Sequence, residues 1–316
     1  MNLYFAPMEG ITGHIYRRAF HTHFPAADTY FTPFISPDSN KILRNKERRD
    51  VLPENNPGMQ VVPQIITNRA DYFLMAAEYL KNEYGYTEVN LNLGCPSGTV
   101  VAKGKGSGFL SRLEELERFF DEVFEKCSLE VSVKTRVGRT DAEDWAEILN
   151  IFKKFPIKEL TVHPRIQKDF YKGQVRMETF DYAYENWERE LCYNGDIFAK
   201  ESYDKLLLRF PKLQSVMLGR GLLSDPYLMG RLRGEALPTE QERKASMRDF
   251  HEQLIAEYGA VLSSNRDLLY KMKELWFYLL DSFADSEKAR KQIRKCEKLS
   301  EYHCIVRELF EGHPLV

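Results

Sequence analysis

Short apolar segments alternate with longer segments of mixed polarity over the first two thirds of the chain. Each short segment is rich in β-branched, leucine or aromatic residues, which is typical of a buried strand, and the longer segments repeat apolar residues at helical spacing. We predict strands at residues 3–6, 29–34, 61–66, 88–93, 131–135, 159–163, 191–193 and 215–218. Helices are predicted near residues 14–23, 69–83, 111–125, 141–154, 176–187 and 199–209.

This alternation predicts βα units and therefore a parallel sheet. Eight strands over a segment of this length are typical of a (β/α)8, or TIM, barrel. A doubly wound sheet would carry a Gly-x-Gly-x-x-Gly turn after its first strand, and no such turn follows Phe5. We therefore expect an α/β fold built on a TIM barrel.

The pattern changes near Leu237. Pro238 interrupts the chain, and the later segments have helical spacing without a clear strand. Helices are expected at residues 240–258, 268–283, 286–298 and 303–310. The expected organisation is a catalytic TIM-barrel domain over residues 1–236, followed by a small all-helical domain over residues 237–316.

Composition narrows the class of protein. With 43% hydrophobic and 29% charged residues, the chain is expected to be globular. No apolar run is long enough for a membrane helix, and the N-terminus lacks the features of a signal peptide. The five cysteines form no Cys-x-x-Cys pair or metal-ligand spacing, which favours free thiols in a cytoplasmic protein without a metal. A net charge of −2 weighs mildly against a nucleic-acid partner, although local basic patches matter more.

Cys95 is the candidate for chemistry. It follows the strand over residues 88–93 in the sequence Asn-Leu-Asn-Leu-Gly-Cys-Pro-Ser, so it is expected at the carboxyl end of a barrel strand, where active sites lie. A thiol with a pKa near 8.5 can donate a proton to a carbanion-like carbon. Many cysteines are buried structural residues, but the position between Gly94 and Pro96 favours a reactive one.

Two glycine-rich segments after the last two predicted strands are typical of a phosphate site. They are Asn194-Gly195-Asp196-Ile197 and Gly219-Arg220-Gly221, in which Arg220 could supply the cation. The middle strands end in amide and cationic side chains that suit the polar edge of a flavin ring, and a lysine there would stabilise its reduced form. These residues are Gln64, Asn92, Lys134 and His163.

Seven motifs in the same order resemble those of the dihydrouridine synthases, flavoenzymes that reduce uridine in RNA. They are residues 6–12, 62–65, 92–96, 133–136, 161–165, 194–197 and 217–221. The chain resembles the bacterial type but departs from it at residues 272–278 and in the loop over residues 97–106, which indicates a divergent subgroup.

The resemblance implies FMN as cofactor, with NADPH, or NADH, as reductant. Hydride would pass from the reduced flavin N5 to C6 of uracil, and Cys95 would protonate C5. The FMN-binding residues implied are Ala6, Pro7, Met8, Gln64, Lys134, His163, Asn194, Gly195, Asp196, Gly219 and Arg220. The substrate-binding residues implied are Asn92, Arg136 and Arg165. The glycine-rich segment after Cys95 is itself expected to be a flexible loop that closes over the substrate, with Lys103 and Lys105 facing phosphates. The family's usual substrate is tRNA, and a monomer is expected.

Two basic segments could bind the RNA backbone. One covers residues 41–49, and the other is the helix expected over residues 286–298. In that helix Lys291, Arg294, Lys295 and Lys298 would share one face.

Other functions remain open at this point. The same chemistry could act on ribosomal RNA, or an FMN barrel could reduce a small pyrimidine or ketone. A non-oxidative barrel enzyme with a phosphorylated substrate and an inert RNA-binding barrel are further alternatives.

Overall fold

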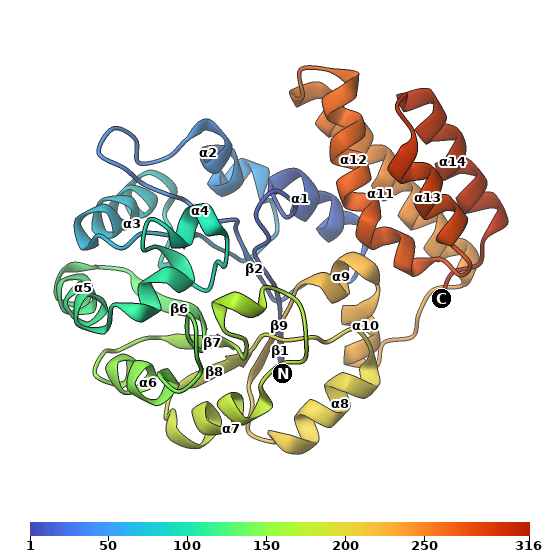
Figure 1. Cartoon of the computed structure of the whole chain (residues 1–316). Helices are drawn as coiled ribbons and strands as arrows, with labels where there is room; N and C mark the ends of the chain where they lie inside the picture. Colours follow the sequence, from blue (N-terminus) through green and yellow to red (C-terminus); the bar gives the residue numbers. More distant parts are fainter. The chain divides into compact units, whose positions relative to one another are not determined.

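A single parallel sheet forms the centre of the first part of the chain. The computed structural model describes all 316 residues, and Figure 1 shows the strands surrounded by helices. The strands are β1 (Asn2–Phe5), β2 (Thr29–Phe31), β3 (Val61–Val62), β4 (Gln64–Ile65), β5 (Glu88–Leu93), β6 (Glu130–Arg136), β7 (Glu159–His163), β8 (Glu190–Tyr193) and β9 (Ser215–Leu218). Their order in the sheet is β3-β2-β1-β9-β8-β7-β6-β5-β4, and all pairs are parallel.

The sheet closes on itself at Pro63. β3 pairs with β2 and β4 pairs with β5, and only Pro63 separates the two short strands. Proline has no N–H to donate, but its carbonyl accepts a hydrogen bond from the Asn90 N–H at 2.9 Å. Residues 61–65 therefore act as one strand of an eight-position barrel, which confirms the expected TIM-barrel fold.

Amphipathic helices surround the strands. The helices of this part are α2 (Asn45–Val51), α3 (Ala70–Tyr84), α4 (Gly98–Val101), α5 (Leu113–Lys126), α6 (Trp145–Lys153) and α7 (Met177–Asn186), with α8 (Lys200–Arg209) after β8. In α5 the buried residues Leu116, Phe119, Phe120 and Val123 follow the helical spacing that places them on one face. α3 ends at Gly85, which has a φ of 72° that glycine adopts without strain.

The eight predicted strands are all present, with differences of a few residues at their ends. The six predicted helices of this region are present as α1 (His14–His23), α3, α5, α6, α7 and α8. The sequence did not predict α2, α4, α9 (Arg220–Ser224) or α10 (Leu228–Arg233), because such short helices show too few repeats of the apolar pattern.

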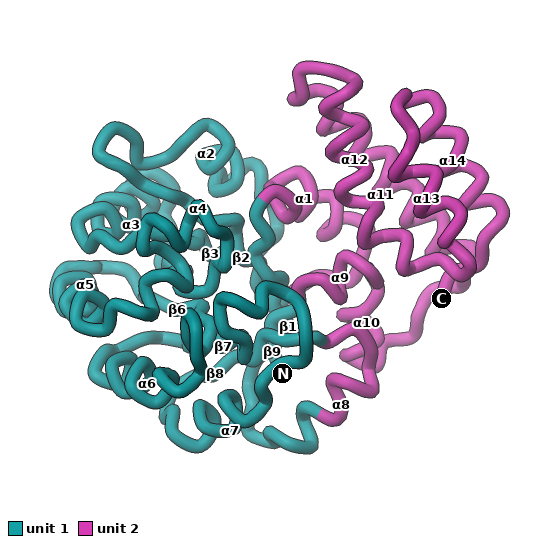
Figure 2. Tube along the Cα trace, in the orientation of Figure 1, with its two compact units in different colours: residues 1–9, 28–196, 206–218 teal, residues 10–27, 197–205, 219–316 magenta.

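The chain separates into two compact units, coloured in Figure 2. The first comprises residues 1–9, 28–196 and 206–218, and the second comprises residues 10–27, 197–205 and 219–316. The second unit therefore includes α1, α9 and α10 besides the C-terminal helices. The division into domains at residues 236 and 237 stays a prediction, from which these units differ by the added segments.

The C-terminal helices pack around an aromatic core within the second unit. They are α11 (Glu240–Val261), α12 (Asn265–Leu279), α13 (Glu287–Lys295) and α14 (Leu299–Gly312). The Trp276 ring packs against Phe283 and Phe310, with centroid distances of 6.0 and 5.9 Å. A buried hydrogen bond of 2.8 Å joins His251 to the Tyr302 hydroxyl. None of the helices combines the length and the hydrophobicity that a membrane span requires.

Candidate active site

The turn that carries Cys95 is held by the side chain of Asn92. β5 ends at Leu93, and the Oδ1 atom of Asn92 accepts hydrogen bonds from the backbone N–H groups of Gly94 and Cys95, at 3.0 and 2.9 Å. Such a side-chain contact stabilises a tight turn directly after a strand. The substrate-binding role expected for Asn92 stays a prediction, and in the structure its oxygen orients Cys95.

The loop after Cys95 packs closely against it. Gly106 has a φ of 56°, and a Cβ there would lie 2.8 Å from the carbonyl oxygen of Cys95. Ser107 donates to the same oxygen from its N–H at 3.2 Å and from its hydroxyl at 2.8 Å. Residues 106–108 are therefore buried and anchored, and the closure of this loop over a substrate stays a prediction.

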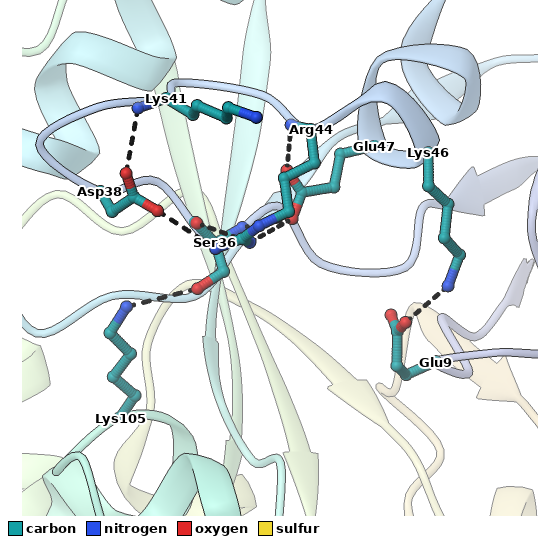
Figure 3. Close-up of polar contacts among 8 residues, drawn as sticks. All are labelled: Glu9, Ser36, Asp38, Lys41, Arg44, Lys46, Glu47 and Lys105. Atoms are coloured by element: carbon teal, nitrogen blue, oxygen red, sulfur yellow. Dashed lines mark hydrogen bonds and ion pairs between the residues drawn. The ribbon is translucent and has the colours of Figure 1, made fainter.

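The lysines of that loop lie on its outer part. Lys103 is exposed, and the Lys105 ammonium donates to the Ser36 hydroxyl at 3.3 Å. Figure 3 shows Lys105 reaching Ser36, beside the ion pairs that Arg44 makes with Asp38 and Glu47. The contact of Lys103 with substrate phosphates stays a prediction.

Cys95 lines a cavity of about 90 Å³ at the carboxyl ends of the strands. A cavity of this size takes one edge of a planar ring rather than a whole cofactor. The residues expected from the sequence that line it are Pro7, Met8, Gln64, Asn92, Cys95, Lys134, Arg136 and His163. The barrel thus brings together side chains from the ends of β1, β4, β5, β6 and β7.

Lys134 is a half-buried cation that lines this cavity and forms no ion pair. Burial lowers its pKa to about 8, and the positive charge of Arg136 acts in the same direction. The thiols of Cys192 and Cys95 oppose this shift, and no carboxylate is among the groups that act on Lys134. An unpaired ammonium in such a place favours binding of an electron-rich or anionic ligand.

The thiol of Cys95 is held in its protonated form. Burial raises its pKa above the ordinary value, and Glu9 adds to that shift. The backbone near Ser97 and the cations Arg136 and Lys134 act in the opposite direction. A neutral thiol is suited to donate a proton, whereas a nucleophilic cysteine requires a lowered pKa.

Arg136 connects the Cys95 turn with the loop after β7. Its guanidinium donates to the carbonyl oxygens of Gly94, Ile166 and Phe170, at 3.0, 2.8 and 2.6 Å. The side chain is 1% exposed, and its Cζ lies 5.5 Å from the centre of the Tyr171 ring. Its expected contact with substrate stays a prediction, and the structure shows that it holds the Cys95 turn against the loop after β7.

Arg165, which is fully buried, forms an ion pair with the half-buried Asp196 beside His163. Both oxygens of Asp196 accept from the Arg165 guanidinium, at 3.0 and 2.5 Å. Arg165 also lies 3.1 Å from the Nε2 atom of His163, which must accept because the guanidinium can only donate. This contact fixes the tautomer of His163 with its proton on Nδ1. The cofactor role of Asp196 and the substrate role of Arg165 stay predictions.

The remaining residues expected to bind FMN lie at the ends of β1, β8 and β9. Ala6 is buried and donates its N–H to the Leu218 carbonyl at 2.8 Å. Asn194 is buried and donates to the Met217 carbonyl at 2.7 Å. Gly195 has no room for a side chain, because a Cβ would lie 2.1 Å from the Tyr193 hydroxyl. Gly219 and Arg220 begin α9 in the second unit, and their part in a phosphate site stays a prediction.

A basic groove of about 940 Å³ lies among the C-terminal helices. It runs between the start of α12 and the connection from α13 to α14. Its cationic side chains are Arg266, Lys273, Arg294, Lys295 and Lys298, and Glu297 is its one acidic side chain. Tyr270, 54% exposed, presents an aromatic ring there, with Arg266 and Lys273 within 5.5 and 6.0 Å of its centre.

The groove changes one expectation from the sequence. α13 ends at Lys295 and Lys298 immediately precedes α14, so the prediction that Lys298 continues the face of one helix is wrong. The helix ends early because the chain turns at Cys296, whose side chain is buried. Arg294 and Lys295 line the groove, whereas Lys291 is exposed without lining it.

A sequence model that describes dihydrouridine synthases matches residues 4–311. The chain belongs to the dihydrouridine synthase family. Among curated relatives, tRNA-dihydrouridine synthase B of Pasteurella multocida is 28% identical over 227 residues, which cover 72% of this chain and 67% of the relative. Probable tRNA-dihydrouridine synthase 1 of Synechocystis sp. is 26% identical over 304 residues, covering 94% and 82%.

Solved structures with the same barrel have little sequence in common with this dihydrouridine synthase family member. The old yellow enzyme of Trypanosoma cruzi is 9% identical with a TM-score of 0.51, covering 77% of this chain and 91% of that one. Morphinone reductase in complex with tetrahydroNAD is 13% identical with a TM-score of 0.50, covering 77% and 90%. These similarities support the TIM-barrel fold.

Sequence reasoning assigned no site role to six residues that line the cavity: Glu9, Pro33, Phe34, Gly94, Pro96 and Tyr171. Tyr171 lies in the loop after β7, with its ring 6.3 Å from that of His163. Glu9 follows the first strand and pairs with Lys46 at 2.7 Å, as Figure 3 shows. Tyr171 lies eight residues after His163 in an irregular loop, so no periodic pattern of apolar residues indicates that it is part of the site. Glu9 was visible in the sequence only as part of the first family motif.

Proposed function

We propose that this protein reduces uridine to 5,6-dihydrouridine in tRNA, with FMN as cofactor and NADPH as reductant. The observation that carries the proposal is the placement of a protonated Cys95 thiol beside the Lys134 ammonium in one cavity. Membership of the dihydrouridine synthase family supports the reaction, and the names of the curated relatives support tRNA as the substrate.

The donor set of the cavity suits FMN. Lys134 is a cation without an acidic partner, so it can bind the electron-rich edge of a flavin ring. Gln64 and His163 line the same cavity and would complete the polar contacts to that edge. The glycine segment at residues 194–196 would hold its phosphate. When bound, FMN supplies the two-electron reduction, with NADPH as the source of electrons.

Cys95 supplies the proton that uracil needs at C5. Its raised pKa keeps the thiol protonated near neutral pH, so the S–H bond breaks as the new C5–H bond forms. The positive charges of Arg136 and Lys134 stabilise the thiolate that remains. Solvent then returns a proton to the sulfur before the next turnover.

The basic groove of the C-terminal helices is the proposed RNA contact. Five cationic side chains and a single acidic one favour a polyanion, and the Tyr270 ring offers a surface on which an unpaired base can stack. This arrangement allows a protein of net charge −2 to bind RNA, because its positive charge is concentrated in one place.

An absorbance spectrum tests the cofactor first. The purified protein should show oxidised-flavin bands at about 375 and 450 nm, and NADPH should bleach them under anaerobic conditions. Unmodified tRNA should then restore the bands and acquire dihydrouridine. A colourless protein that takes up no added FMN would contradict the proposal. If ribosomal RNA or free uridine restores the flavin bands and tRNA does not, the proposed substrate is wrong.

A cysteine pair tests the proton donor. Cys95→Ala should lower the rate of uridine reduction by at least about 100-fold, the usual contribution of a general acid. Its flavin content and its bleaching by NADPH should stay unchanged. Cys127→Ala is the matched control, since Cys127 is a half-buried thiol outside the cavity. Equal rates for the two variants would remove Cys95 from the mechanism.

A further inference from the structure

A continuous chain of buried side chains connects the Cys95 turn to a carboxylate at the far end of β5. From the turn, Asn92 donates to Gln64 at 2.6 Å, Gln64 donates to Asn90 at 2.8 Å, and Asn90 donates to Ser132 at 3.0 Å. The Ser132 hydroxyl then donates to the Glu88 carboxylate at 2.6 Å. All members except Glu88 are at most 7% exposed.

The strand pairing produces this chain. Gln64 lies opposite Asn90 in the pairing of β4 with β5, and Asn90 lies opposite Ser132 in the pairing of β5 with β6. Residues at every second position of a strand point to the same side, so Glu88, Asn90 and Asn92 form one row. The chain therefore runs along β5 and uses one residue of each neighbouring strand.

Both ends of the chain determine its direction. The Glu88 carboxylate can only accept, so Ser132 must donate to it and can accept only from Asn90. At the other end the backbone N–H groups of Gly94 and Cys95 can only donate, so the Asn92 amide must present its oxygen to them. Every amide between these ends then has one possible orientation.

We propose that Glu88, Ser132 and Asn90 are positioning residues for Cys95. They hold the oxygen of Asn92 toward the turn, although none of them touches the substrate, and their effect on turnover rests on the proposed role of Cys95 as proton donor. Breaking the chain lets the Asn92 amide rotate, and the turn then loses its acceptor. The turn opens, and the thiol becomes more exposed and more acidic.

The Lys158 ammonium strengthens the fixed end. It bonds to Glu88 at 2.7 Å and to Glu130 at 2.6 Å. In a Glu88→Gln variant this ammonium attracts the amide oxygen, which turns the new NH2 group toward Ser132. Ser132 would then donate toward Asn90, and every hydrogen bond of the series would reverse its direction. The NH2 group of Asn92 would then face the N–H groups of the turn.

Alkylation of Cys95 by iodoacetamide tests the proposal without any cofactor or RNA. The rate is followed by peptide mass spectrometry as a function of pH, because the thiolate is the species that reacts. Ser132→Ala should raise the rate at neutral pH by about fivefold, the equivalent of one lost hydrogen bond, and shift the pH profile to lower pH. Ser132→Thr, which keeps the hydroxyl, should restore the wild-type profile.

Ser215→Ala is the matched control for this variant. Ser215 is a buried barrel serine whose hydroxyl donates to a buried carboxylate, Glu159, at 2.9 Å, and it has no connection to Cys95. Its removal should leave the alkylation profile unchanged. If Ser132→Ala and Ser215→Ala give the same profile, the proposal is wrong.

A second pair keeps the test decisive if Ser132→Ala does not fold. Glu88 lies at the half-buried end of the hydrogen-bond series, and Glu88→Gln should change the alkylation profile as Ser132→Ala does. Glu130→Gln removes the other carboxylate bound to Lys158 and should have no effect. Equal profiles for this pair overturn the proposal. A wild-type protein that fails to reduce uridine would contradict the proposed function alone, because the alkylation rate reports on the hydrogen-bonded side chains without any need for turnover.

Discussion

The arginines in and beside the cavity of the barrel and the cations in the groove of the C-terminal helices have opposite roles. In and beside the cavity, Arg136 and Arg165 are at most 1% exposed and bond to backbone carbonyls or to Asp196. In the groove, Arg294 and Lys295 are exposed and have no carboxylate partner. The same residue types therefore build a site in one region and leave charge available in the other.

This difference has an energetic origin. A buried guanidinium has lost its water, so it remains only where protein oxygens replace that water, and it then fixes the segments that supply them. An exposed cation keeps its water and changes stability little, but it can release counterions when it meets a polyanion. The comparison shows that a family motif does not by itself distinguish an arginine that binds a ligand from one that stabilises the fold.

Replacement of Arg136 should give the largest effect on stability. Arg136→Ala leaves the carbonyl oxygens of Gly94, Ile166 and Phe170 without their donor. We expect the free energy of unfolding to fall by about 3–5 kcal/mol, because three carbonyl oxygens lose their donor and each such loss costs about 1–3 kcal/mol. Urea unfolding at neutral pH measures the change.

The matched variant in the groove is Arg294→Ala. It should change the free energy of unfolding by less than about 0.5 kcal/mol, as is usual for an exposed residue. The loss of unfolding free energy in Arg136→Lys should lie between those of the two alanine variants, because an ammonium cannot reproduce the geometry of three fixed donors. Comparable losses for Arg136→Ala and Arg294→Ala would end the distinction between the two regions.

Lys134 should destabilise the protein that lacks a ligand, unlike the cations of the groove. Its pKa is about 8 when folded and 10.5 in its ordinary state, so the unfolded chain holds this proton more tightly. Below pH 8 the full penalty is present, and stability should rise as the pH increases from 8 to 10.5. The difference of 2.5 in pKa corresponds to about 3 kcal/mol.

Lys134→Met removes this penalty while keeping an unbranched side chain. At pH 7 the variant should unfold with a free energy up to about 3 kcal/mol higher, and the gain should disappear toward pH 10.5. Glu159, whose pKa burial raises to about 7, affects stability in a lower pH range and does not obscure the result. A gain that stays constant with pH would show that packing, not the charge, is responsible.

The sequence predicted the barrel because its strands are short, apolar and regularly spaced. β5, β7 and β9 have the predicted bounds, and the order of the strand-end motifs correctly predicted that Gln64, Cys95 and Lys134 lie together at one end of the barrel. Parallel strands make this possible, since their carboxyl ends all meet at one mouth.

The side-chain partners could not be predicted in this way. The bonds of Arg136 to Ile166 and Phe170 depend on an irregular loop, and the pair of Arg165 with Asp196 joins residues from different strand ends. Tyr171 enters the cavity from the same loop, without periodicity to reveal it. Local sequence patterns report which face of an element is buried, whereas these contacts depend on how loops fold back over the barrel.

Charge reversal in the groove should weaken RNA binding without affecting stability. The double variant Arg294→Glu and Lys295→Glu should lower affinity for tRNA by about tenfold at moderate salt, and the dependence of affinity on salt should become shallower. Flavin content and the unfolding transition should stay unchanged. Lys291→Glu is the control, because Lys291 lies on α13 outside the groove, and an equal loss there would indicate a diffuse charge effect.

Tyr270 should contribute least, but it separates stacking from charge within the groove. Its exposed ring lies between Arg266 and Lys273, so Tyr270→Ala removes a stacking surface without changing the net charge. Loss of one base–aromatic stack is worth about 1 kcal/mol or slightly more, so affinity for tRNA should fall about fivefold with an unchanged salt dependence. Tyr270→Phe keeps the ring and should bind as the wild type does. If Tyr270→Phe loses as much as Tyr270→Ala, the hydroxyl that Arg266 contacts at 3.3 Å matters instead of stacking, and the ring serves to orient a cation.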